Sequence, residues 1–234
     1  MYGLNAVALV FFGCINVAAY QLCKCQEKKR RKVLLCLCAT LLFGNLLRYC
    51  IVYPFGKGVI MLPVEFSTVA YFLVPAILLT SKKRLHSWAA YSGLMAGFFY
   101  YMAMIVVGGM IYGQNPPLDI YISLFCHGCI YFCGFVTIST ELCSAKDAPK
   151  LGLGVASVAV RAAILRPYVV GSNRLLIYIL LDAVVVKRIL PKSTWTVALP
   201  IYYLAVAAFV LLTIRSFFRR NQKQYQKFSA PQAA

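Results

Sequence analysis

The sequence is poor in charged residues, and acidic residues are especially rare. Only 13% of its 234 residues are charged, and only six are Asp or Glu, whereas a soluble globular domain has about 25% charged residues. This scarcity excludes a water-soluble domain. Instead, 62% of the residues are apolar and the mean hydropathy is +0.76, which predicts an integral membrane protein.

Several familiar signatures are also missing. The chain has no phosphate-binding loop, dinucleotide fingerprint or zinc-protease helix. Most of its ten cysteines lie inside apolar stretches, where a thiol packs as a small apolar side chain, so we expect packing rather than disulfides. Cys126, Cys129 and Cys133 share a helix face, but His127 points about 100° away from it. We therefore expect neither a metal site nor a cofactor.

The basic residues are placed between the apolar runs rather than on one soluble face. There are 24 Lys and Arg, and the loops after the first, third, fifth and seventh apolar runs hold six, three, two and five of them. Because cytoplasmic loops are enriched in Lys and Arg, this alternation predicts an outside N-terminus and a cytoplasmic C-terminus. It also favours membrane orientation over nucleic-acid binding.

The apolar runs predict an all-α fold, a bundle of seven transmembrane helices. The predicted spans are residues 2–22, 33–53, 58–80, 87–112, 118–140, 151–168 and 196–214. Residues 175–190 are too short for a comfortable span and are predicted to form a re-entrant or interfacial helix. Residues 1–214 then form a single transmembrane bundle, and residues 215–234 form a basic amphipathic cytoplasmic tail.

One helix carries a flat face of small residues. Ala89, Gly93 and Gly97 follow one another at four-residue spacing. Such faces let helices approach closely, and in a multi-pass protein they usually pack internally. A homo-oligomer through the Gly93/Gly97 face is the alternative. The other expected partners are membrane lipids.

A layer of polar side chains is predicted inside the outer leaflet. Counted from the outer helix ends at 1.5 Å per residue, Asn45, Arg48, Glu65, His127 and Arg161 all lie roughly 7 to 14 Å deep. Ionisable groups in spanning helices are costly and by default mark a site or pair with one another. We therefore expect these side chains, with the neighbouring Ser67, to face one cavity.

This layer allows more than one function. In a lipid-ester acyltransferase or hydrolase, Ser67 would be the nucleophile, His127 the general base and Glu65 its orienting carboxylate. Arg48 or Arg161, with Asn45, would bind the substrate headgroup. The alternatives are a carrier or receptor that binds a small anion or translocates a proton through the same layer, and a non-catalytic scaffold subunit whose polar groups only fix helix register.

Several short stretches resemble a known family. These are LPVEFS at 62–67, LLT at 78–80, YSGLMAG at 91–97, HG at 127–128, and the later Asn173 and Tyr178. In this order they resemble the bacterial YwaF-type integral membrane proteins, distant relatives of eukaryotic transmembrane phospholipid acyltransferases and androgen-induced fatty-ester hydrolases. The resemblance implies a seven-helix bundle that opens toward lipid, with His127 as a working residue.

The chain departs from that family at the nucleophile. The YwaF-type proteins typically have His at the position of Glu65 and Cys at that of Ser67. In the related acyltransferases the nucleophilic Cys directly follows the Pro, where this chain has Val64. Since valine cannot attack a carbonyl, either Ser67 has taken that role or this chain keeps the cavity without acyl chemistry.

Overall fold

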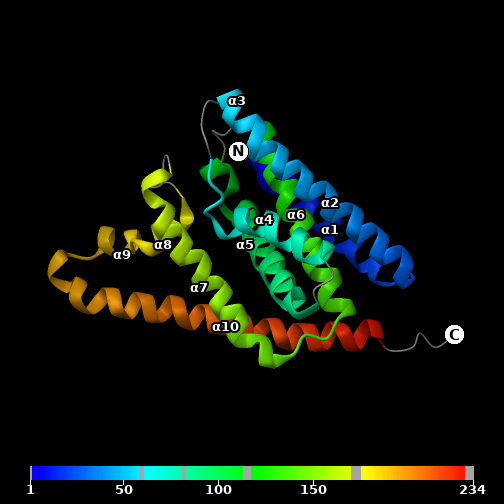
Figure 1. Cartoon of the computed structure of the whole chain (residues 1–234). Coiled ribbons are helices and arrows are strands. Elements are labelled where there is room, and N and C mark those ends of the chain that lie inside the picture. Colours follow the sequence, from blue (N-terminus) through cyan, green and yellow to red (C-terminus); the bar gives the residue numbers. More distant parts are fainter. Residues whose placement is uncertain (1, 58–60, 81–82, 113–116, 170–174, 230–234) are drawn as a thin grey trace.

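The computed structural model describes residues 2–57, 61–80, 83–112, 117–169 and 175–229, and every regular element among them is a helix. Asn173 lies outside these residues. Figure 1 shows a bundle above one long helix that runs across its base. The α-helices are α1 (Tyr2–Cys23), α2 (Glu27–Leu47), α3 (Tyr53–Lys57), α4 (Phe66–Leu79), α5 (His86–Tyr112), α6 (Pro117–Thr140), α7 (Ala148–Leu165), α8 (Leu176–Leu181), α9 (Val184–Ile189) and α10 (Trp195–Ser229).

Six helices of the described chain are long and apolar enough to cross a membrane. They cover Gly3–Cys23, Glu27–Phe55, Lys83–Gly108, Leu118–Thr140, Ala145–Tyr168 and Lys192–Ser229. This confirms a helical, multi-pass membrane protein, but it does not confirm the predicted seven spans. The third predicted span, 58–80, contains only the 14-residue α4. At 1.5 Å per residue α4 is about 21 Å long, shorter than a hydrocarbon core of roughly 30 Å.

The segment predicted to be re-entrant or interfacial forms two short helices. Both α8 and α9 have six residues, and Ala183 joins them with a φ of 49°. Neither helix can cross a bilayer. Their arrangement agrees with the prediction that residues 175–190 do not span.

Helices α5 and α6 form the centre of the bundle, and glycines allow their backbones to touch. A Cβ atom on Gly93 would lie 2.4 Å from the Ile130 carbonyl oxygen, and one on Gly97 would lie 2.4 Å from the Tyr131 Cβ. On the facing helix, a Cβ on Gly134 would lie 2.8 Å from the Ala90 oxygen. The small-residue face of α5 therefore packs against α6 in this chain.

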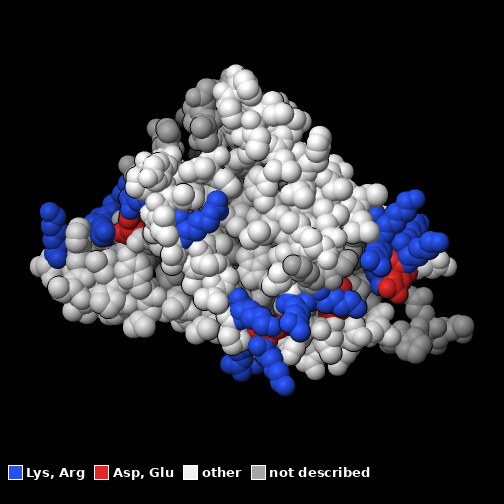
Figure 2. All heavy atoms as spheres, in the orientation of Figure 1, with Lys and Arg blue, Asp and Glu red and all other residues white. Residues whose placement is uncertain are grey.

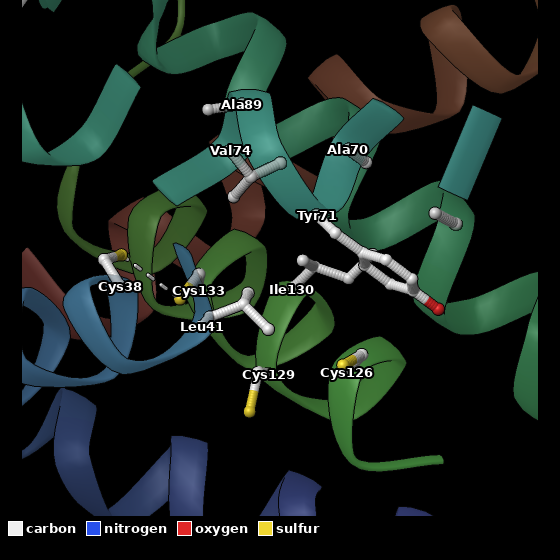
Figure 3. Close-up of a cluster of buried hydrophobic side chains, with 11 residues drawn as sticks. Cys38, Leu41, Ala70, Tyr71, Val74, Ala89, Cys126, Cys129, Ile130 and Cys133 are labelled. Atoms are coloured by element: carbon white, nitrogen blue, oxygen red, sulfur yellow. Dashed lines mark hydrogen bonds between the residues drawn. The ribbon is translucent and has the colours of Figure 1, made fainter. Parts of the chain in front are cut away.

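Four cysteines help to fill the core between α2, α4 and α6. Cys38, Cys126, Cys129 and Cys133 are buried together with aliphatic side chains (Figure 3). The Sγ atoms of Cys38 and Cys133 lie 3.8 Å apart, and both thiols are free. These side chains pack as small apolar groups, as the sequence predicted.

The last helix is continuous across the predicted boundary between bundle and tail at residue 214. α10 has 35 residues and is about 52 Å long. Beyond the boundary, Phe217 and Asn221 are buried. The Asn221 Nδ2 donates to the carbonyls of Ile138 and Glu141, at 2.9 and 2.7 Å, and its Oδ1 accepts from the Cys143 N–H at 2.8 Å. One side chain of α10 thus satisfies carbonyls that the end of α6 leaves open.

Candidate functional site

The residues predicted to share one polar layer belong to three separate groups of contacts in the structure. Arg48 starts a five-residue π-helical turn, Arg48–Val52, after α2. Its guanidinium lies 3.6 Å from the Asp119 carboxylate at the start of α6 and 4.9 Å from the Tyr53 ring centroid. Arg48 is therefore paired with Asp119.

Glu65 and Arg161 belong to a second group, where the segment before α4 meets α7 and α8. The Glu65 carboxylate lies beside the backbone N–H groups of Leu176 and Ile177, at the start of α8, which favour its charged form. The Arg161 guanidinium donates to the Pro63 carbonyl at 2.5 Å. The two side chains do not pair with each other; each holds a different backbone group.

Two further contacts fasten α8 to α7. The Tyr178 hydroxyl donates to the Ala162 carbonyl at 2.8 Å, and Arg166 binds the Asp182 carboxylate through two hydrogen bonds of 2.6 and 2.5 Å. The hydrogen bonds from Arg166 lower the pKa of the Asp182 carboxyl. The whole arrangement orders the chain around α8, which is a structural role for Glu65 and Arg161.

His127 forms the third group, a buried polar centre between α4, α5 and α6. Its Nδ1 lies 2.8 Å from the carbonyl oxygen of Ser123, one turn earlier on α6. The Tyr71 hydroxyl oxygen lies 2.6 Å from Nδ1 and 3.1 Å from Nε2, and the Tyr100 ring stacks on the imidazole with centroids 3.5 Å apart. Because a carbonyl can only accept, Nδ1 carries a proton and Nε2 accepts from Tyr71.

Asn45 and Ser67 lie near this centre on neighbouring helices. The Asn45 Nδ2 donates to the Leu41 carbonyl at 2.8 Å and lies 3.9 Å from the sulfur of Cys126, the residue before His127. Ser67 is four residues before Tyr71, so the two share one face of α4 about one turn apart. Among the described residues of α4, Tyr71 is the one whose hydroxyl hydrogen-bonds to His127.

The predicted triad is therefore not assembled in this structure. Within the described chain, no hydrogen bond joins His127 to Glu65 or to Ser67. Tyr71 and Ser123 were not among the predicted site residues, although helical spacing places each on the same face as a residue that was predicted. Tyr71 lies four residues after Ser67, and Ser123 lies four residues before His127.

A cavity of about 170 Å³ lies elsewhere, between α5, α6 and α10. Arg220 and Gln224 line it from the part of α10 that was predicted to be a separate tail. The Gln224 Oε1 is buried without a hydrogen-bond partner, and none of the ion pairs in the described part of the chain includes Arg220. The apolar lining residues are Leu94, Met95, Phe98, Phe99, Tyr131, Phe135, Ile138 and Phe217.

This cavity has an apolar wall on α5 and α6, whereas Thr213, Ser216, Arg220 and Gln224 line it from α10 together with Phe217. Its volume of about 170 Å³ is enough for a short stretch of acyl chain. The sequence contained the signal in the alternation of Phe with Arg in the tail. Because the last span was expected to end near residue 214, these residues were predicted to form a separate amphipathic tail.

We found no match to this chain among protein-family models, curated proteins or solved structures.

Proposed function

We propose that this protein is a multi-pass membrane protein that binds a single acyl chain with an anionic head in the cavity between α5, α6 and α10. The observation that carries the proposal is the composition of the cavity. Phe98, Phe99 and Phe135 line it from α5 and α6, whereas Arg220 and Gln224 line it from the charged end of α10. A membrane lipid has this same division between chain and head.

Selectivity in such a site comes from the head. An acyl chain that leaves the bilayer for an apolar cavity gains little, because lipid tails are as apolar as the cavity wall. The Arg220 guanidinium can donate two parallel hydrogen bonds to a carboxylate or a phosphate. The unpartnered Gln224 Oε1 can accept a hydrogen bond from the glycerol hydroxyl of a lysophosphatidate head.

The test compares ligands that differ only in the head. The full chain in neutral detergent is titrated with oleate, oleoyl lysophosphatidate and oleyl alcohol, and bound ligand is counted by native mass spectrometry. We expect both anions to bind more tightly than the alcohol. We expect Arg220→Gln to reduce the preference for the anions over the alcohol about tenfold. This factor is at the low end for a hydrogen bond to a charged group, because Arg220 is exposed.

Arg219→Gln is the matched control, because Arg219 is also exposed but does not line the cavity. A second variant, Met95→Trp, fills the cavity and should weaken all three ligands together. Equal binding of oleate and oleyl alcohol to the unmodified protein would refute an anion-selective site. Equal losses in Arg219→Gln and Arg220→Gln would refute the role of Arg220.

Acyl transfer or hydrolysis of lipid esters is the second candidate function. It is supported by the YwaF-type resemblance and by the position of Ser67, one turn from Tyr71 on the same face of α4. In this mechanism the Tyr71 hydroxyl leaves the imidazole, His127 takes the Ser67 proton, and Ser67 attacks the ester carbonyl. The ester C–O bond then breaks, His127 gives the proton to the leaving alcohol, and water or an acceptor alcohol takes the acyl group from Ser67. Turnover of lipid esters by the unmodified protein, lost in Ser67→Ala, is the expected result. Unchanged turnover in that variant would exclude this mechanism.

A further inference from the structure

Two basic segments from opposite ends of the sequence meet at one end of the molecule. Tyr20, near the end of α1, has Lys24 over its ring at 4.4 Å and Lys227, from α10, at 4.9 Å. The rings of Tyr20 and Phe228 lie 5.4 Å apart in an edge-on contact. Figure 2 shows basic side chains gathered where α1 and α2 meet. We call this surface the basic cap, formed by Lys24, Lys28, Lys29, Arg30, Arg31, Lys32, Lys223 and Lys227.

The charges of the basic cap are not neutralised within the protein. Glu27 is the one acidic residue in the stretch 24–32, and residues 215–229 contain none. All the ion pairs between described residues lie elsewhere, at Asp119, Glu141, Asp147 and Asp182. Bringing eight cations to one end of the molecule costs electrostatic free energy, which a bound polyanion would recover.

A shallow groove on α2 gives this charge a defined shape. Lys28, Arg31 and Lys32 are three and four residues apart, so they lie on one helix face, and all three are exposed. Leu35 and Cys36 continue that face about 6 Å further along the helix. The groove therefore changes from cationic to apolar toward the membrane-spanning part of α2. Its lining residues are Glu27, Lys28, Arg31, Lys32, Leu35 and Cys36.

We propose that the basic cap binds the headgroup of a membrane phospholipid that carries several phosphate charges, with Lys28, Arg31 and Lys32 contacting the phosphates. The groove has a cationic part followed by an apolar part at Leu35 and Cys36, which matches a lipid headgroup followed by its acyl chain. A soluble polyphosphate has no such apolar part. The site is separate from the cavity between α5, α6 and α10 and does not depend on its ligand.

The experiment measures lipid binding to the full chain in phosphatidylcholine nanodiscs. Fluorescent phosphatidylinositol bisphosphate and phosphatidylserine are compared by binding titration, and inositol trisphosphate is used as the free headgroup. The triple variant Lys28→Gln/Arg31→Gln/Lys32→Gln removes three cations of the groove. The matched control, Lys187→Gln/Arg188→Gln/Lys192→Gln, removes three cations near α9 and leaves the groove intact.

We expect the bisphosphate lipid to bind most tightly and the groove variant to lose about fivefold for each cation removed, roughly a hundredfold in total. The control should stay within twofold. Tighter binding of phosphatidylserine, equally tight binding of free inositol trisphosphate, or equal losses in the two variants would overturn the proposal. If the groove variant does not fold, Lys28→Arg/Arg31→Lys/Lys32→Arg must retain binding, and raised salt must weaken binding to the unmodified protein.

Discussion

Adding one methyl group at the contact between α5 and α6 should destabilise the bundle measurably. In Gly93→Ala the new Cβ would lie 2.4 Å from the Ile130 carbonyl oxygen, which belongs to a backbone that cannot rotate away. An ordinary contact is at least 3.4 Å, so the helices must separate by about 1 Å. Overpacking of this kind costs about 1–3 kcal/mol.

The control is Gly44→Ala on α2, where a Cβ atom would meet nothing within 4 Å. Both variants gain about 1 kcal/mol of helix propensity, so their difference isolates the packing cost. For a chain of this size, 1–3 kcal/mol corresponds to roughly 2–12 °C in Tm.

Thermal unfolding in detergent can be followed with a thiol-reactive dye, because the cysteines are free and Cys38, Cys126, Cys129 and Cys133 are buried. We expect Gly93→Ala to unfold at a lower temperature than the unmodified protein or Gly44→Ala. Equal unfolding temperatures for the two variants would refute the close contact between α5 and α6.

Two further predictions concern the attachments of α10 and α8. Asn221→Leu should lower the free energy of unfolding by about 2–4 kcal/mol, because it leaves backbone groups at the end of α6 without partners. The neighbouring exposed Gln222→Leu should change it little in the same thermal assay. Arg166 lowers the pKa of Asp182, so this pair stabilises the attachment of α8 above about pH 4 and is lost as the pH falls through the lowered value. The protection of amides 176–181, taken relative to their intrinsic exchange rate at each pH, should therefore fall in acid, and in Asp182→Asn it should be low already at neutral pH; pH-independent protection in the unmodified protein would contradict this.

Hydropathy predicted most of the long helices because each must bury apolar residues over a fixed length. It failed at α4, where Pro63 and Glu65 precede the helix and leave only 14 helical residues. Depth counting also placed Glu65 and His127 at similar heights. Height along a helix does not fix direction around it, and the two side chains contact different helices. That direction depends on tertiary contacts, such as the one between the Glu65 carboxylate and the start of α8.

The cavity was missed for a related reason. The charges of Arg219, Arg220 and Lys223 separate the end of α10 from its apolar part in any hydropathy profile. Phe217 and Asn221 are nevertheless buried, because α10 lies against the ends of α5 and α6 (Figure 1). A sequence alone does not show that a charged helix end has neighbours on one side.

The contact made by Asn221 has a consequence for biosynthesis. The end of α6 is completed by a residue that is translated 81 positions after Thr140. Until that residue leaves the ribosome, the carbonyls of Ile138 and Glu141 must be hydrated or held by another protein. Insertion of the earlier helices can therefore proceed in order, but closure of the bundle waits for the last one.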